Sequence, residues 1–101
     1  MNARRIGGML GLALRARQAA AGMDACRILV RSGECGVLLL DGAAAENTRK
    51  RAEELSGRSG TPVVILPEGL MEEATGKGNI ILGIRKGSFA EQILAYAREE
   101  D

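Results

Sequence analysis

The apolar residues near the N-terminus recur at the spacing of helical faces. About every third or fourth residue is apolar from the start of the chain, which predicts a helix over residues 3–16. Its apolar face is formed by Ile6, Met9, Leu10, Ala13 and Leu14. An extended piece at 18–21 leads to a second helix over 23–32, with Gly33 as the glycine that ends it. The buried face of this second helix holds Met23, Cys26, Leu29 and Val30, whereas Asp24, Arg27, Ile28 and Arg31 fall on the other side.

Continuous apolar runs in the rest of the chain predict buried strands. They span residues 36–41, 61–66 and 80–84. The polar segment 46–55 between the first two runs predicts an exposed helix, so this part forms a right-handed βαβ unit. A short helix is expected over 67–75, with Pro67 or Glu68 in its first turn.

The last segment predicts one more helix. Ser88-Phe89-Ala90-Glu91 has the form of a capping box. The apolar face that follows it holds Phe89, Ile93, Leu94 and Ala97. Taken together, the elements predict a single α/β domain over residues 1–101, a three-layer α/β/α sandwich with a small mixed sheet of about four strands.

The composition limits which catalytic, metal-binding and membrane roles the chain can have. There is no histidine, so the usual general base near neutral pH is missing. Cys26 and Cys35 lack the spacing of a zinc site and indicate reduced thiols in the cytoplasm. No apolar run approaches the roughly 18 residues of a membrane span. We therefore expect no enzyme, metal, cofactor or membrane role; the one enzymatic alternative is a phosphoacceptor role for Asp41 at a strand end.

Basic residues are concentrated in the first third of the chain. Residues 1–33 contain six arginines and one aspartate, whereas residues 34–101 contain eight basic and twelve acidic residues. Such asymmetry favours an anionic partner such as nucleic acid, and a solvated charged surface is the alternative.

The segment around Gly22 offers a possible contact with such a partner. Glycine lets a ligand approach the backbone closely, and the first turn of the following helix presents free N–H groups. We expect Arg15, Arg17 and Arg27 to surround this helix start. An RNA backbone is one partner that fits; alternatively, Asp24 is simply an acidic residue favoured by the helix dipole.

Several short strings, in their order along the chain, resemble one protein family. They are "LGLALRARQAAAG" at 10–22, "LVRSG" at 29–33, Asn47-Thr48, Thr61-Pro62-Val63, "ATGKGN" at 74–79 and "GSFA" at 87–90. Together they resemble the archaeal and eukaryotic ribosomal-protein family that binds RNA kink-turns, and within it the small bacterial branch of YlxQ-like ribosomal proteins.

The resemblance implies an α/β/α sandwich that binds RNA with tandem sheared G·A pairs beside a bulge. The family's contacts come from the start of the second helix and from the loop before the last strand. Carried onto this chain, the positions of the first region are Gln18, Gly22, Asp24, Ala25 and Ile28, and those of the second are Gly76, Lys77, Gly78 and Asn79. The family's Glu and Lys are replaced here by Ala25, which cannot accept from a guanine edge, and by Ile28, which cannot neutralise a phosphate.

We therefore expect a non-enzymatic RNA-binding ribosomal or translation-associated protein. Its partner would be ribosomal RNA or another kink-turn RNA, within a ribosome or another ribonucleoprotein. The cations Arg15, Arg17, Arg27 and Lys77 would contact phosphates, and Asp24 and Asn79 would contact bases or sugar hydroxyls. The alternative is a protein–protein adaptor that has lost RNA binding and uses Ile28 as an apolar contact.

Overall fold

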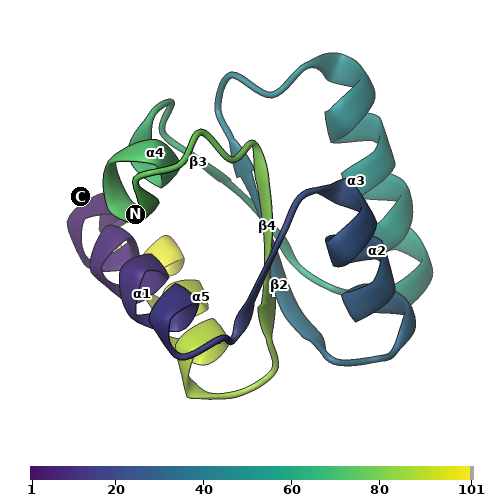
Figure 1. The fold of residues 1–101 in the computed structure, drawn as a ribbon, viewed down its shortest axis with the longest axis horizontal. Helices are drawn as coiled ribbons and strands as arrows, with labels where there is room; N and C mark the ends of the chain where they lie inside the picture. Colours follow the sequence, from purple (N-terminus) through teal and green to yellow (C-terminus); the bar gives the residue numbers. More distant parts are fainter. Residues whose placement is uncertain (101) are drawn as a thin grey trace.

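A four-stranded mixed sheet separates two layers of helices (Figure 1). The computed structural model describes residues 1–100. Its strands are β1 (Ala19–Ala21), β2 (Cys35–Asp41), β3 (Val63–Leu66) and β4 (Ile81–Arg85). They lie in the order β1-β4-β2-β3, with β4 antiparallel to both neighbours and β2 parallel to β3. The predicted three-layer α/β/α sandwich is confirmed.

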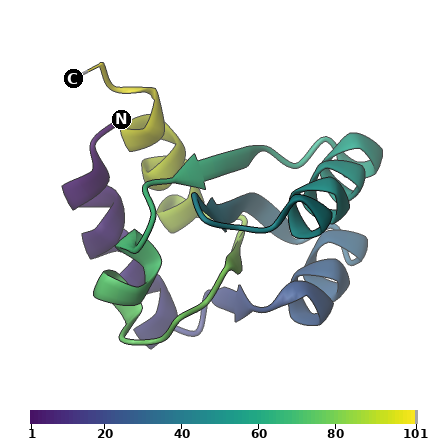
Figure 2. The same cartoon turned by 90° about the horizontal axis from the view of Figure 1, so that it is seen from above.

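The two helical layers bury opposite faces of this sheet. The helices α1 (Ala3–Arg15), α4 (Leu70–Thr75) and α5 (Ser88–Arg98) cover one face, and α2 (Met23–Arg31) and α3 (Glu46–Ser59) cover the other (Figure 2). Alternate side chains of β2 enter the two cores: Val37 and Leu39 pack on the α1 side, Leu38 and Leu40 on the α2 side. This double burial explains why β2 is an unbroken apolar run.

Two predicted helix starts are wrong. Helix α4 begins at Leu70 rather than at Pro67, because Gly69 turns the chain with a φ of 87° and the Leu70 N–H donates to the Pro67 carbonyl at 3.1 Å. The capping box at Ser88 is absent, because Gly87, with a φ of 144°, is the N-cap and no side chain caps the helix. Glycine takes both positions since each needs a positive φ.

The ends of α1 and α2 close with the same hydrogen-bond pattern. After α2, the N–H groups of Gly33 and Glu34 donate to the carbonyls of Val30 and Leu29, and Gly33 has a φ of 78°, which confirms it as the terminating glycine. After α1, Arg17 occupies the corresponding left-handed position with a φ of 58°. It is the only residue other than glycine with a positive φ in the described part of the chain.

Glycines let α4 pack closely against α1. A Cβ on Gly7 would lie 3.4 Å from the Leu70 side chain, and one on Gly11 would lie 3.5 Å from the Ala74 carbonyl oxygen. The contact holds α4, and with it the loop before β4, against the C-terminal half of α1. Of the helices in residues 1–100, none has the length and apolar character needed to cross a bilayer.

Candidate nucleic-acid interface

Gly22 joins the edge strand β1 to helix α2 in a conformation that only glycine adopts readily. Its φ and ψ are 90° and 160°, and it is the N-cap of α2. Its carbonyl oxygen accepts the first helical bond from the Cys26 N–H at 3.0 Å, and no side chain caps the helix. The N–H groups of the first turn are therefore without helix partners.

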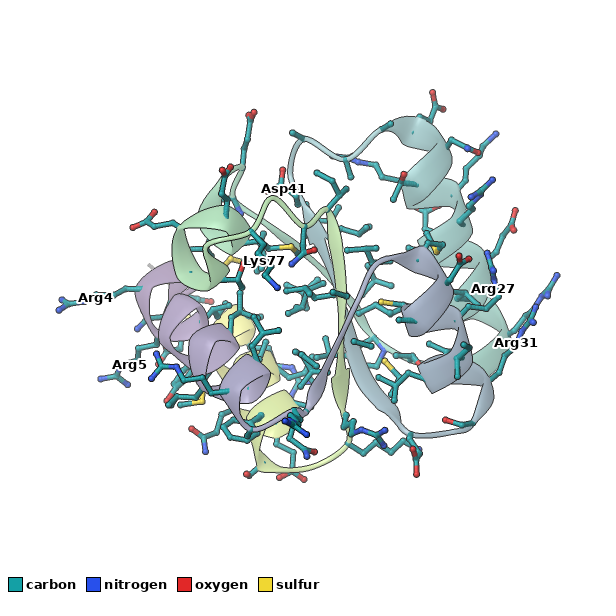
Figure 3. The ribbon with its side chains drawn as sticks, viewed as in Figure 1. Arg4, Arg5, Arg27, Arg31, Asp41 and Lys77 are labelled. Atoms are coloured by element: carbon teal, nitrogen blue, oxygen red, sulfur yellow. The ribbon has the colours of Figure 1, made fainter. Side chains whose placement is uncertain are left out.

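The loop at 76–79 leads into the strand that pairs with this helix start. The Gly22 N–H donates to the Ile81 carbonyl at 3.1 Å, and Ala21 pairs with Leu82, so the residues just before Ile81 reach the same end of the sheet. Figures 1 and 2 show the α4–β4 loop and the β1–α2 connection at this end. The loop and the helix start therefore share one end of the sheet, with Lys77 on the α4 side of it (Figure 3).

Local hydrogen bonds shape the loop and leave one cation free. Gly76, with a φ of 73°, ends α4, and the Lys77 N–H donates to the Thr75 Oγ1 at 3.2 Å. Lys77 itself is exposed. By contrast, the Asn79 Nδ2 is buried, with no acceptor among the described protein atoms. The Nδ2 group is therefore closed to a ligand in this loop conformation, although Asn79 as a whole is partly exposed.

Asp24 and Arg27 form a surface pair on the first turns of α2. Nη1 of Arg27 donates to Oδ1 of Asp24 at 3.1 Å, with the Asp24 side chain 95% exposed and that of Arg27 33% exposed. Exposed pairs of this kind contribute at most about 1 kcal/mol to folding. Both groups are thus open to exchange their partner for a ligand.

The expected position of Arg17 beside Gly22 is wrong. The Gln18 carbonyl accepts from the Arg85 N–H at 2.8 Å, whereas Gly22 bonds to Ile81, so Arg17 and Gly22 lie at opposite ends of β1. The reason is the length of β1, which places roughly 15 Å of extended chain between them. The contact of Arg17 and Gln18 with RNA stays a prediction.

Arg15 lies near the end of α4, which leads into the second segment. A Cβ on Gly11 would be 3.7 Å from Nη2 of Arg15 and 3.5 Å from the Ala74 carbonyl oxygen, so the guanidinium lies near the end of α4. From the sequence, no role was predicted for Gly7 and Gly11. Their spacing of one helical turn was the available signal for a close helix contact.

Ala25 and Ile28 border a hollow on the β1 side of α2. The hollow has a volume of about 360 Å³, and its lining combines the apolar side chains of Ala20, Ala25 and Ile28 with the charged ones of Arg17, Glu34 and Arg85. Ile28 is 71% exposed, as the helical arrangement predicted. This surface carries no charge where the family has a lysine.

The alternative sites have structural roles. Asp41 is buried, and its two carboxylate oxygens accept from the N–H groups of Ala43 (2.8 Å) and Gly69 (3.0 Å), which ties together the loops after β2 and β3.

Burial raises the pKa of the Cys26 thiol to about 12, with a smaller contribution from Cys35. Both thiols are buried. The described residues contain no group of three or more Cys, Asp or Glu placed to hold a metal ion.

Comparison with solved structures places this architecture among known proteins. A protein of unknown function from Bacillus halodurans C aligns with a TM-score of 0.88 and 26% identity, over 94% of this chain and 98% of that one. The 15.5kD RNA binding protein of Giardia lamblia aligns with a TM-score of 0.74 and 12% identity, over 93% and 82%. The Pelota protein of Thermoplasma acidophilum aligns with a TM-score of 0.62 and 15% identity, over 83% of this chain and 28% of that longer one.

What these proteins share with the chain is the fold. No family model and no curated protein matches the sequence. The strings described above and the geometry at Gly22 are therefore the residue-level basis for a functional assignment.

Proposed function

We propose that the chain binds a sharply bent, structured RNA of the kink-turn type, in the ribosome or elsewhere in translation. The observation that carries the proposal is the Gly22–Ile81 hydrogen bond, which sets an uncapped helix start at the end of the sheet where the Gly76-Lys77-Gly78 loop leads into β4. We call these two segments, residues 22–25 and 76–79, the ledge. The RNA-binding protein of Giardia lamblia, with the same fold, supports the choice of ligand.

Each part of the ledge has a physical role in this proposal. The open N–H groups at the start of α2 bind a phosphate, because a helix N-terminus carries a partial positive charge. Gly22 allows the RNA backbone to approach without a Cβ in the way. Lys77 neutralises a second phosphate, and Asp24 accepts from a base edge or a sugar hydroxyl. The chemistry is binding alone, with no catalytic step.

A gel shift with two RNAs tests the proposal. One RNA carries a kink-turn, and the other is a straight duplex of equal length made by pairing the bulge. We expect preferential, salt-sensitive binding of the bent RNA, weakened by Lys77→Ala. The matched control is Lys86→Ala, which removes an exposed lysine at the opposite end of β4. Equal affinity for the two RNAs, or equal effects of the two variants, would contradict the proposal.

The exposure of Ile28 favours a second candidate function, an adaptor that binds another protein. An isoleucine that is 71% exposed, at the rim of a hollow with both apolar and charged lining, is a suitable contact for a partner's side chain. Ile28→Lys separates the two functions. It restores a cation of the kind found in the family, so it should strengthen RNA binding, whereas it should abolish an apolar protein contact.

A further inference from the structure

Four arginines line a groove between α2 and α3. Arg27 and Arg31 contribute from α2, and Arg51 and Arg58 contribute from α3, around a volume of about 250 Å³. The spacing of each pair, one and two helical turns, keeps its members on one side of their helix. In Figure 3, Arg27 and Arg31 lie on the side of the molecule opposite to Arg4 and Arg5.

The positive charge of this groove is mostly uncompensated. Arg27 is paired with Asp24, whereas within residues 1–100 no carboxylate lies within ion-pair distance of Arg31, Arg51 or Arg58. Glu54 is the one acidic residue in the lining. Like charges brought together across a groove disfavour the folded state, and an anionic partner would offset that repulsion.

The groove overlaps the ledge at Met23. Its lining starts at Met23, the residue after Gly22, and continues along α2 through Arg27 to Arg31. The two α2 arginines extend about 6 Å along the helix axis, and the two α3 arginines extend about 10 Å. A row of that length suits an extended polyanion better than a single small anion.

We propose that this groove binds the phosphate backbone of the RNA stem leading away from the ledge. The inference rests on the proposed function, because it extends the same bound RNA along α2. The inference also bears on Ile28, which stands where the kink-turn family has a lysine. In this chain the cations of α2 are Arg27 and Arg31, and they line the groove, whereas Ile28 lines the hollow on the β1 side. Guanidinium groups bind phosphate oxygens with paired hydrogen bonds and remain charged at all relevant pH values.

The salt dependence of RNA binding tests this inference. The double variant Arg51→Gln/Arg58→Gln removes two groove cations from the exposed surface of α3. The control Arg4→Gln/Arg98→Gln removes two exposed arginines from the α1–α5 layer. We expect the slope of log affinity against log salt to fall by about two for the groove variant and little for the control. The affinity gap between wild type and groove variant should then narrow on the order of tenfold between about 50 and about 200 mM salt.

A kink-turn RNA with a shortened stem supplies a second readout. The groove variant should bind this RNA as tightly as the wild type does, because the stem phosphates are missing. Groove and control variants that behave alike on the long-stem RNA would overturn the inference and leave the proposed function intact. A wild type that binds bent and straight RNA equally, with both lost in the groove variant, would support the groove and overturn the proposed function. Tighter binding of polyglutamate than of stem RNA would overturn the assignment to RNA.

Discussion

The Gly22 N–H donates to the Ile81 carbonyl oxygen at 3.1 Å, across 58 intervening residues. Through this bond the first edge strand ends beside the start of the last strand. The start of α2 and the Lys77 loop therefore share one end of the sheet, although no local sequence pattern connects them. Changes at Gly22 should alter both the stability of the junction and the binding of a ligand there.

Gly22→Ala should destabilise the protein by about 1–3 kcal/mol, because a φ of 90° with a ψ of 160° is essentially restricted to glycine. A Cβ at this position meets nothing within 4 Å, so backbone strain is the whole cause. Urea denaturation measures the change. The control is Gly57→Ala on α3, where a Cβ also meets nothing and the helix should gain about 0.5–1 kcal/mol. Equal effects at the two glycines would contradict the strain argument.

Local patterns predicted the core elements of the fold because each has a strong periodic signal. Strand β2 is apolar on both faces, and α1 and α2 each present one apolar stripe. The failures lie at turns: Gly69 and Gly87 adopt positive φ values that place the helix starts one to three residues away from the expected positions. Whether a glycine takes such a conformation depends on the path of the chain between layers, which a short window does not contain.

The geometry of the candidate site depends on contacts between distant strands and helices more than the core elements do. Arg17 is close to Gly22 in sequence, yet the register of β1 on β4 puts it near Arg85. The groove between α2 and α3 was also missed from the sequence, because Arg58 lies beyond the helix predicted over 46–55, which continues to Ser59, and because spacing does not show which helix faces Arg51. Helix packing decides that contact.

Asp41→Ala should cost about 2–3 kcal/mol, since the N–H groups of Ala43 and Gly69 would lose a charged acceptor. Asp41→Asn retains one carbonyl oxygen and should lose less. Chemical denaturation of the two variants checks this order. Incubation with acetyl phosphate should leave the wild-type protein without an acyl-phosphate label, because the carboxylate is buried and both its oxygens are occupied. A label that disappears in Asp41→Asn would restore the phosphoacceptor hypothesis.

The stability of the protein should fall as the pH rises from about 9 towards 12, in part because of Cys26. Burial raises the pKa of this thiol from 9.0 to about 12, so in this window the unfolded chain loses a proton that the folded chain keeps. The free energy of unfolding then decreases with pH by up to about 1.4 kcal/mol per unit for this group. Urea denaturation at several alkaline pH values should show a shallower decrease for Cys26→Ala than for the wild type. Parallel curves would show that Cys26 titrates alike in both states.

Gly11 should tolerate alanine but not a larger side chain. A Cβ at this position would be 3.5 Å from the Ala74 carbonyl oxygen, an ordinary contact, and alanine favours the helix by about 0.5–1 kcal/mol over glycine. Leucine would push α4 away from α1, at a cost of about 1–3 kcal/mol. Because α4 leads directly into the Lys77 loop, Gly11→Leu should also weaken RNA binding in the gel shift. Unchanged RNA affinity in a folded Gly11→Leu protein would show that the position of α4 does not control the loop.

Arg17→Gly should stabilise the protein while weakening its binding to RNA. Arg17 has a φ of 58° at the end of α1, in the position that Gly33 occupies after α2, and a side chain there costs about 1 kcal/mol relative to glycine. Arg17 is exposed at the far end of β1, and its contact with an RNA phosphate stays a prediction from the sequence. Arg17→Lys keeps both the charge and the strain, so it should change stability little and retain most of the affinity. Thermal denaturation and the kink-turn gel shift measure the two effects separately, and an Arg17→Gly protein that binds RNA as tightly as the wild type would remove Arg17 from the interface.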